Sequence, residues 1–377
     1  MAKTVKVSSK KQTTRNKSIL SDNSLSFLRN YLNTASPVGF ESKGQKIWLD
    51  YLRPFIDTDF SDPYGTAVGV INPKNNFKVV IEAHADEISW FINYISPEGL
   101  LYLKRNGGVD HQIAPSQRVF VHGKNGAIKA VFGWPAIHTR TGNADSKEVQ
   151  PKVENLFLDC GARNKKEVEQ LGIQIGSVVT YQDGFDELSY DYFIARAFDN
   201  RIGGFMIAEV ARLLKENKKI LPYSLYLVNA VQEEIGLRGA EMIARRIKPD
   251  IAIITDVTHD TATPMVNKII EGDVTCGKGP SLAFGPAVHN KLLTVVRETA
   301  EKKNIPVQLR TVSRSTGTDT DSFAYANDGC PSVLISIPLR YMHTTVEMLH
   351  KKDVEETIRL MYETLLTITP KINLKYF

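Results

Sequence analysis

Cysteine is scarce in this sequence, and long apolar runs are absent from it. The three cysteines, Cys160, Cys276 and Cys330, are scattered, odd in number and not paired at metal-motif spacing, which argues against a disulfide framework and a cysteine zinc motif. No apolar run approaches the ~20 residues of a membrane span, and none near the start resembles a signal peptide. We therefore expect a cytoplasmic protein with reduced thiols and no membrane partner.

The greater part of the chain also lacks an excess of charge. The formal net charge is +5, but residues 1–24 hold six Lys or Arg side chains against one acid, Asp22, and the remaining residues are balanced at 41 basic and 41 acidic. A basic segment rich in Ser, Thr and Lys is typical of a disordered tail. Contact of this tail with nucleic acid or an anionic surface is the less favoured alternative. Because the rest of the chain has no basic stripe, we expect no nucleic-acid partner.

Apolar side chains, in contrast, are plentiful. They make up 42% of the 377 residues, enough for one large domain and a smaller one. Before residue 88 and after about residue 185, apolar runs of strand length alternate with amphipathic segments of helical period. This alternation is typical of a largely parallel sheet with helices on both faces. We therefore predict an α/β fold with a central, largely parallel (mixed) sheet covered by helices.

The middle of the chain follows a different pattern. Short β-like runs, such as 90–95 and 127–132, alternate there with glycine turns. Such spacing predicts a small β-barrel-like domain inserted into the α/β domain. The predicted units are a disordered basic tail (1–24), a discontinuous catalytic domain (25–87 and 186–377) and an inserted β-rich domain (88–185).

Histidines and carboxylates stand at the ends of predicted strands, or shortly after them. The strands are 77–83, 192–198, 224–231, 251–255 and 332–337, and the residues are His84, Asp199, Glu234, Asp256 and His343. Each alone is more often a helix cap, a turn former or a solvated side chain. Because open α/β sheets gather function at the carboxyl ends of their strands, five such residues together favour one shared site.

The composition of this set indicates metal binding. Two histidines and three carboxylates suit a pair of borderline divalent ions, zinc or cobalt, better than magnesium, which prefers oxygen ligands alone. With only five side chains, one carboxylate must bridge the two metals. Paired metals can hold a water molecule and polarise a carbonyl, as in aminopeptidases.

Two further acids, Glu233 and Asp86, stand beside the predicted ligands. Neighbouring side chains at a strand end point in different directions, so Glu233 and Glu234 should not share one task. The alternative for this pair is a solvated acidic turn. Asp86 lies two residues after His84 on an extended segment, so it can accept the second imidazole N–H and fix the ring tautomer. The alternative for Asp86 is a surface salt bridge.

Several separated motifs carry a family resemblance. They are His84-Ala85-Asp86-Glu87-Ile88, Ala197-Phe198-Asp199-Asn200-Arg201, Gln232-Glu233-Glu234-Ile235-Gly236, Thr255-Asp256-Val257 and Arg340-Tyr341-Met342-His343. In this order they resemble the tetrahedral (TET) and glutamyl aminopeptidases, which are dinuclear metallo-aminopeptidases, some of them also named endoglucanase. The resemblance covers essentially everything after the tail. Small departures, such as Ser89 in place of an expected glycine, remove no ligand.

The resemblance implies a role for each site residue. Asp199 bridges both metals. His84 and Asp256 complete one site, while Glu234 and His343 complete the other. Glu233 is the general base that takes a proton from the attacking water and later delivers it to the leaving amine; a carboxylate left free of metal suits that task.

Two loops near the predicted site are assigned in the same way. Gly317-Thr318-Asp319 resembles the family's glycine-threonine-aspartate loop beside the active site. After His343, residues 344–347 fit a capping box that starts a helix, so we assign Thr344 and Glu347 to structure rather than chemistry.

The implied function is a metal-dependent aminopeptidase that removes N-terminal residues from short peptides. By resemblance it forms a homo-oligomer, a hollow tetrahedral dodecamer whose contacts involve the insert. Trp90, Phe91 and Phe132 are then either interface anchors or the insert's own core. The alternatives are a polysaccharide hydrolase of the endoglucanase type and an inactive scaffold of the same fold. Neither the preferred first residue nor the native metal has a signature in the sequence.

Overall fold

The computed structural model of this chain describes residues 18–140 and 150–377. Most of the predicted disordered tail lies outside these residues. The first helix, α1 (Asp22–Asn33), begins before the predicted end of the tail, with Ser21 as its N-cap. In these two stretches, no helix has both the length and the apolar character of a membrane span.

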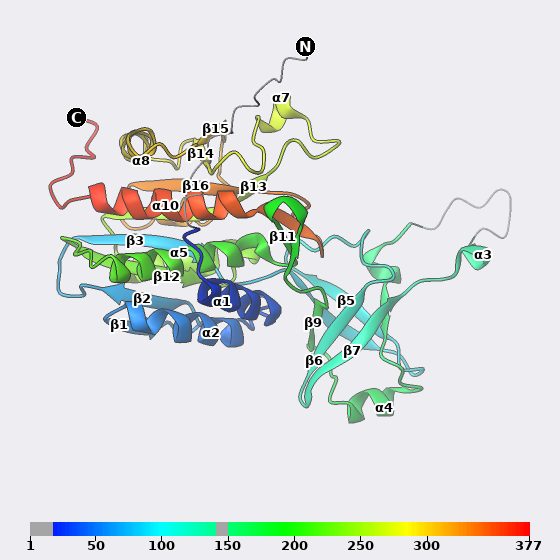
Figure 1. Cartoon of the computed structure of the whole chain (residues 1–377). Helices are drawn as coiled ribbons and strands as arrows, with labels where there is room; N and C mark the ends of the chain where they lie inside the picture. Colours follow the sequence, from blue (N-terminus) through cyan, green and yellow to red (C-terminus); the bar gives the residue numbers. More distant parts are fainter. Residues whose placement is uncertain (1–17, 141–149) are drawn as a thin grey trace, which may run out of the picture.

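A mixed sheet of eight strands forms the centre of the α/β part (Figure 1). Its strand order is β1-β2-β12-β3-β13-β16-β14-β15. Strands β12, β3, β13 and β16 pair in parallel, whereas β1, β2 and β14 add antiparallel pairs. The strands are β1 (Thr58–Ser61), β2 (Ala67–Ile71), β3 (Lys78–His84), β12 (Ser224–Ala230), β13 (Ile251–His259), β14 (Ser281–Phe284), β15 (Gln308–Thr311) and β16 (Ser332–Leu339).

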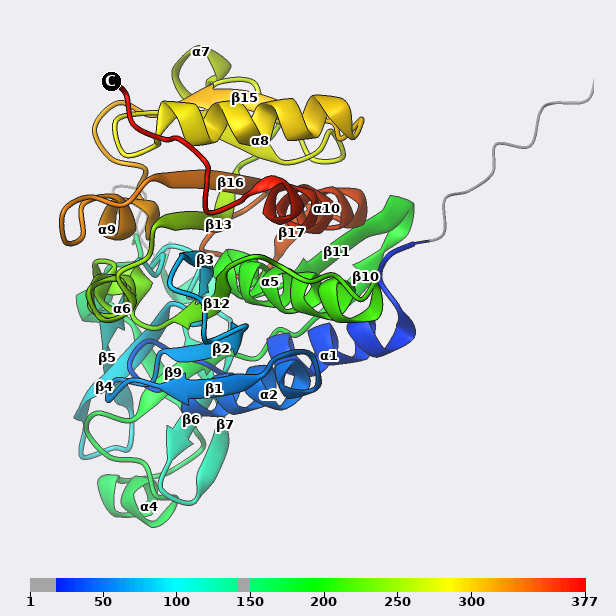
Figure 2. The ribbon, with the colours of Figure 1, turned by 90° about the vertical axis from the view of Figure 1, so that its left-hand side faces the viewer.

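Helices cover both faces of this sheet (Figure 2). Two long ones, α5 (Phe198–Glu216) and α10 (Lys351–Thr367), pack on one face, where they are joined by α1, α2 (Ser42–Leu52) and α8 (Asn290–Lys302). The shorter α6 (Arg238–Ile247) and α9 (Thr320–Ala324) pack on the other face. Because the sheet is covered on both sides, its central strands are apolar runs; all eight residues of β16 are buried.

The insert is a closed six-stranded barrel beside the α/β part (Figure 1), with strand order β4-β5-β8-β7-β6-β9. Its strands are β4 (Ser89–Ile95), β5 (Leu101–Asn106), β6 (Arg118–Gly123), β7 (Gly126–Gly133), β8 (Phe157–Asp159) and β9 (Val178–Tyr181), and its helices are α3 (Ile137–Arg140) and α4 (Lys165–Gln170). The predicted α/β fold with a small barrel-like insert is therefore confirmed.

The barrel has its own core. Trp90 and Phe132 are only 0% and 2% exposed, and their rings meet edge to face. Of the two roles considered for these residues, the core role is therefore correct and the exposed interface anchor is wrong. Phe91 is half-buried.

Three local predictions around the site were wrong. The predicted strand 192–198 is shorter: β11 (Tyr192–Ala195) belongs to a separate antiparallel sheet with β10 (Asp186–Leu188) and β17 (Glu347–His350), and Asp199 lies in the first turn of α5. No helix starts at 344–347, because Glu347 begins β17 and pairs with Ala195. Asp256 does not end its strand, since β13 continues beside β16 to His259.

Candidate metal centre

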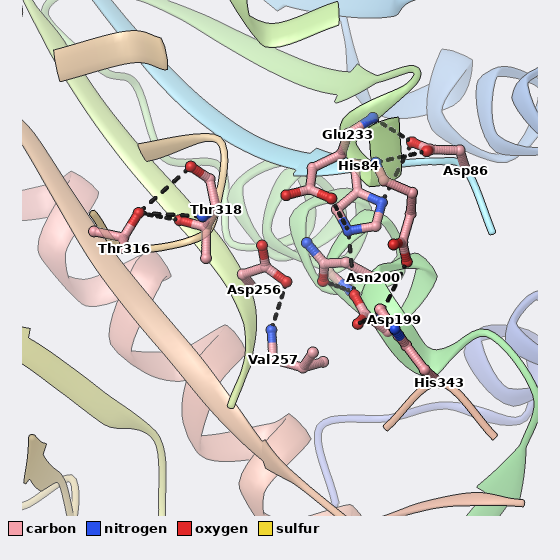
Figure 3. A network of polar contacts seen from close by, with 12 residues as sticks. His84, Asp86, Asp199, Asn200, Glu233, Asp256, Val257, Thr316, Thr318 and His343 are labelled. Carbon is pink, nitrogen blue, oxygen red and sulfur yellow. Dashed lines mark hydrogen bonds and ion pairs between the residues drawn. The ribbon is translucent and has the colours of Figure 1, made fainter. Parts of the chain in front are cut away.

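The structure brings the five predicted ligand residues together beside the carboxyl ends of the central strands. Figure 3 labels four of them, His84, Asp199, Asp256 and His343. The ligand-type atoms of His84, Asp199 and Asp256 lie within 4.8 Å of one another, and so do those of Asp199, Glu234 and His343. Asp199 belongs to both groups. These two donor sets have one carboxylate in common, and a third set, His84, Glu233 and Glu234, overlaps both of them.

Neighbouring parallel strands explain the convergence of three of these residues. His84 is the last residue of β3, and Ala230, the last residue of the adjacent β12, pairs with it. The short turn Glu233–Ile235 follows β12 and carries both glutamates. Asp256 lies within β13, on the other side of β3. Since parallel strands end at the same edge of a sheet, these side chains meet there.

Asp199 lies between the two histidines. Its Oδ1 is 3.2 Å from His84 Nε2, and its Oδ2 is 3.3 Å from His343 Nε2. His343 Nε2 is also 3.3 Å from Glu234 Oε1. Each oxygen of Asp199 therefore faces a different imidazole, which is the disposition that a bridging carboxylate needs.

Both imidazoles are oriented by a partner on their other nitrogen. His84 Nδ1 lies 3.4 Å from Asp86 Oδ1, an ion-pair contact that does not meet hydrogen-bond geometry. His343 Nδ1 donates a hydrogen bond of 3.2 Å to the carbonyl of Gly108, in the segment that follows β5 of the barrel. In each ring Nε2 is consequently the nitrogen that faces the cluster, as expected of metal-binding histidines.

Asp86 has a second task at this site. Its two carboxylate oxygens accept the main-chain N–H groups of Glu233 at 3.0 Å and Glu234 at 3.1 Å. Asp86 is fully buried. It therefore fixes the turn that carries both glutamates as well as the ring of His84, and the surface salt bridge considered from the sequence is wrong.

The site concentrates several buried carboxyl groups in a small volume, and their pKa values are shifted. Burial, followed by repulsion from neighbouring acids such as Asp319 and Asp256, raises the pKa of Glu233 to about 10 against the opposing effect of His84. Burial and the nearby Asp199 raise the pKa of Asp256 to about 7. Although burial opposes it, contacts with Asp199 and Glu234 raise the pKa of His343 to about 11. Buried carboxylates at this density are unfavourable unless cations compensate them, so the donors fit divalent metal ions.

Comparison with known proteins identifies the family. Residues 65–360 match the family described as M42 glutamyl aminopeptidase. The chain belongs to this M42 family. The resemblance to the TET and glutamyl aminopeptidases is thereby confirmed.

Individual known proteins are similar to this chain over nearly their whole length. A lysyl aminopeptidase from Pyrococcus furiosus is 31% identical over 335 residues, which cover 88% of this chain and 94% of the relative. The TET aminopeptidase from a marine sediment archaeon of the Thaumarchaeota superposes with a TM-score of 0.88 at 28% identity, covering 93% of this chain and 98% of the other. The Pyrococcus horikoshii TET1 peptidase, which can assemble into a tetrahedron or a large octahedral shell, shares the fold with a TM-score of 0.81 at 24% identity, over 92% of this chain and 100% of the other.

In this M42 protein a cavity of about 310 Å³ is lined by most of the site residues, namely Asp199, Glu233, Glu234, Asp256 and His343. Gly317 and Thr318 of the predicted loop line it, together with Thr316. Asp319, the third residue of that loop, is buried instead and contributes to the raised pKa of Glu233. The loop therefore lies beside the site, as the resemblance implied.

Two residues at the site were missed from the sequence. Glu347 is buried and accepts the main-chain N–H of Asp199 at 3.1 Å and that of His343 at 2.8 Å. Its sequence context gave a misleading signal, since it completed a capping-box pattern. Arg310 lines the cavity from the edge strand β15. A lone arginine in a short polar strand gave no signal at all.

Proposed function

We propose that this protein is a metal-dependent aminopeptidase that hydrolyses the N-terminal peptide bond of short peptides. The observation that carries the proposal is the pair of donor sets sharing Asp199, found in a chain of the M42 family. Two histidines and several carboxylates in one cavity are the donors that zinc and cobalt accept. The acidic lining also suits the positively charged α-amine of a peptide.

The proposed ligands follow the two donor sets. His84 and Asp256 would hold one ion, Glu234 and His343 the other, and Asp199 both. When bound, two such ions activate a water molecule and polarise the scissile carbonyl. Asp86 keeps the ring of His84 and the glutamate turn in place, which makes it a positioning residue.

Glu233 is the general base in this proposal. Its Oε2 is 3.8 Å from His84 Nε2, farther than Asp199 Oδ1 at 3.2 Å, and its side chain lines the cavity. A carboxylate that holds no metal ion can take a proton from water and deliver it to the leaving amine. Glu233 also has a donor atom close to those of His84 and Glu234. A metal-ligand role is therefore the alternative to the base role, and mutation of Glu233 has to distinguish the two.

The other functions considered for this fold are less well supported. A glycosidase uses two carboxyl groups across a sugar and has no use for histidines at donor distance from them. An inactive scaffold would lack one of the proposed ligands or the base, and all six side chains are present at the site. The proposal extends to a homo-oligomer, with the tetrahedral dodecamer as the expected form.

The function is tested with metal-stripped protein. The protein is assayed on aminoacyl-p-nitroanilides before and after addition of zinc, cobalt or manganese, with an N-acetylated substrate and a soluble cellulose as controls. We expect hydrolysis only with metal, and none of the acetylated substrate or the polysaccharide. Polysaccharide cleavage that survives chelation would establish the alternative function instead.

A further inference from the structure

Arg310 stands out among the residues that line the cavity. Side chains two apart on a strand share a face, and on β15 Gln308 and Arg310 are partly buried while Leu309 and Thr311 are exposed. The guanidinium therefore faces the sheet rather than solvent. It is the only Lys or Arg side chain on the described lining, which also includes Glu233, Asp256 and three threonines.

The guanidinium of Arg310 is poorly paired. Within residues 18–140 and 150–377, its one hydrogen bond is a long contact of 3.4 Å from Nη2 to Ser336 Oγ, Nε has no acceptor, and no carboxylate lies within 4.0 Å. A guanidinium has five N–H donors, and arginines in protein interiors are usually paired. The contacts within the protein thus leave most of its donors available.

The surroundings of Arg310 do not explain it as a structural cation. Burial lowers its pKa, and the more distant Asp256 and Glu271 only oppose this effect. In the proposed enzyme the charge of Asp256 is directed to a metal ion, which leaves Arg310 without a counter-ion. A fork of N–H donors at the wall of a cavity is suited to a carboxylate, which it can bind with two parallel hydrogen bonds.

We propose that Arg310 is a specificity-determining residue that binds a carboxylate of the peptide substrate. The inference rests on the proposed aminopeptidase function and names its substrate class, peptides with an acidic group close to the scissile bond. Two parts of a short peptide carry that chemistry: the side chain of an N-terminal Glu or Asp, and the C-terminal carboxylate of a dipeptide.

The test compares matched substrates in metal-loaded protein. Glu-p-nitroanilide against Leu-p-nitroanilide isolates the side chain, because neither has a terminal carboxylate. Leu-Gly against Leu-Gly-amide isolates the terminus. In the wild type we expect kcat/KM to favour the acidic member of one pair, and Arg310→Gln to reduce that ratio about 10- to 100-fold, the range for a lost charge-assisted hydrogen bond.

Two further variants separate recognition from structure. Arg310→Lys keeps the charge without the fork and should restore the ratio in part. Arg314→Gln is the matched control, since Arg314 is exposed, lies four residues along and is not on the cavity lining; it should leave the ratio unchanged. The inference would be overturned if Arg310→Gln lowered kcat/KM equally for the acidic and the neutral substrate of each pair. It would also be overturned if the variant left the ratio of these two kcat/KM values unchanged.

A binding measurement keeps the inference separate from the function. Calorimetry on metal-stripped protein compares glutamate α-amide with glutamine α-amide, and Leu-Gly with Leu-Gly-amide, for the wild type and Arg310→Gln. In the pair whose acidic member the wild type prefers, that acidic ligand should bind about 10- to 100-fold more weakly to Arg310→Gln. If the wild type hydrolyses no substrate, the proposed function fails while this measurement still decides on Arg310. Equal binding of both members by the wild type overturns the role of Arg310 alone.

Discussion

Glu233 and Glu234 are adjacent in the chain but have different neighbours. Glu234 lies against His343 at 3.3 Å, whereas Glu233 is nearest to His84 at 3.8 Å and lines the cavity. Both main-chain N–H groups are held by Asp86. The turn fixed in this way carries Glu234, a proposed ligand, next to Glu233, the proposed base.

The proposed base gives the first prediction. Glu233→Gln removes the proton acceptor but keeps the shape, so turnover should fall about 100- to 10,000-fold while both metal ions remain bound. Steady-state kinetics and metal analysis by mass spectrometry measure the two effects. Glu241→Gln is the control, because Glu241 is a half-buried side chain of α6 that does not line the cavity. Loss of one metal along with activity would make Glu233 a ligand instead.

The shared carboxylate gives the second prediction. Asp199→Asn keeps the size of the side chain but weakens both donor sets at once, because each oxygen faces a different histidine. Metal content should fall at both sites, and activity with it. Circular dichroism checks that the variant is folded. A folded variant with its full metal content would exclude the bridging role.

The sequence predicted those site residues whose position follows from the order of strands in the sheet or from a family motif. His84 ends the central strand β3, Glu234 lies in the turn after β12, and family motifs marked Asp199 and His343. Asp256 was also found, although its strand continues past it, because a parallel strand can pass the site before it ends. Arg310 could not be predicted, since its relevance depends on which side chains lie opposite it.

The short strand β17 positions two of the proposed ligands. Through Glu347 it holds the backbone of Asp199, at the start of α5, and that of His343, in the loop before β17. Pairing of Ala195 with Glu347 places β17 beside β11, just before α5. One small sheet therefore sets the separation of two proposed ligands from different parts of the chain.

The third prediction follows from this arrangement. Glu347→Gln replaces one accepting oxygen with an NH₂ group, so one of the two N–H donors loses its acceptor. Metal affinity should fall about 10- to 100-fold, as is usual for groups that orient ligands. Calorimetric titration of the metal-stripped protein with zinc measures it. An unchanged affinity would reduce Glu347 to a purely structural role.

The elements differed in how far the sequence determined them. The buried strands β3, β12 and β16 are continuous apolar runs and were predicted closely. The strand β17 was not, because its formation depends on pairing with β11, about 150 residues away in the chain. Local sequence also could not predict three residues with left-handed backbone, since non-glycine residues rarely adopt it. They are Ala197, Gln232 and His343, with φ of 59°, 58° and 62°.

At the scale of the whole molecule, the barrel and the α/β part each have a hydrophobic core of their own. The barrel stands to one side of the sheet (Figure 1). A domain with its own core can present an outer surface to other subunits without disturbing the strands that carry the site. The two-part organisation therefore suits an enzyme that assembles.

The fourth prediction concerns this assembly. Size-exclusion chromatography with light scattering should give a particle of about twelve chains, as the TET resemblance implies. Because hollow shells restrict entry to small substrates, long folded proteins should not be cleaved while short peptides are. A stable monomer with full activity on peptides would show that the protein does not need to assemble in order to function.

The contact between Gly108 and His343 has a practical consequence for protein engineering. A Cβ added at Gly108 would come within 2.8 Å of His343 Nδ1, so only the bare backbone of glycine can approach this closely. The carbonyl that fixes this imidazole is supplied by the segment after the barrel strand β5. Trimming the chain to its α/β part would free that ring to rotate, and the resulting minimal fragment would have lost an anchor of its own catalytic centre.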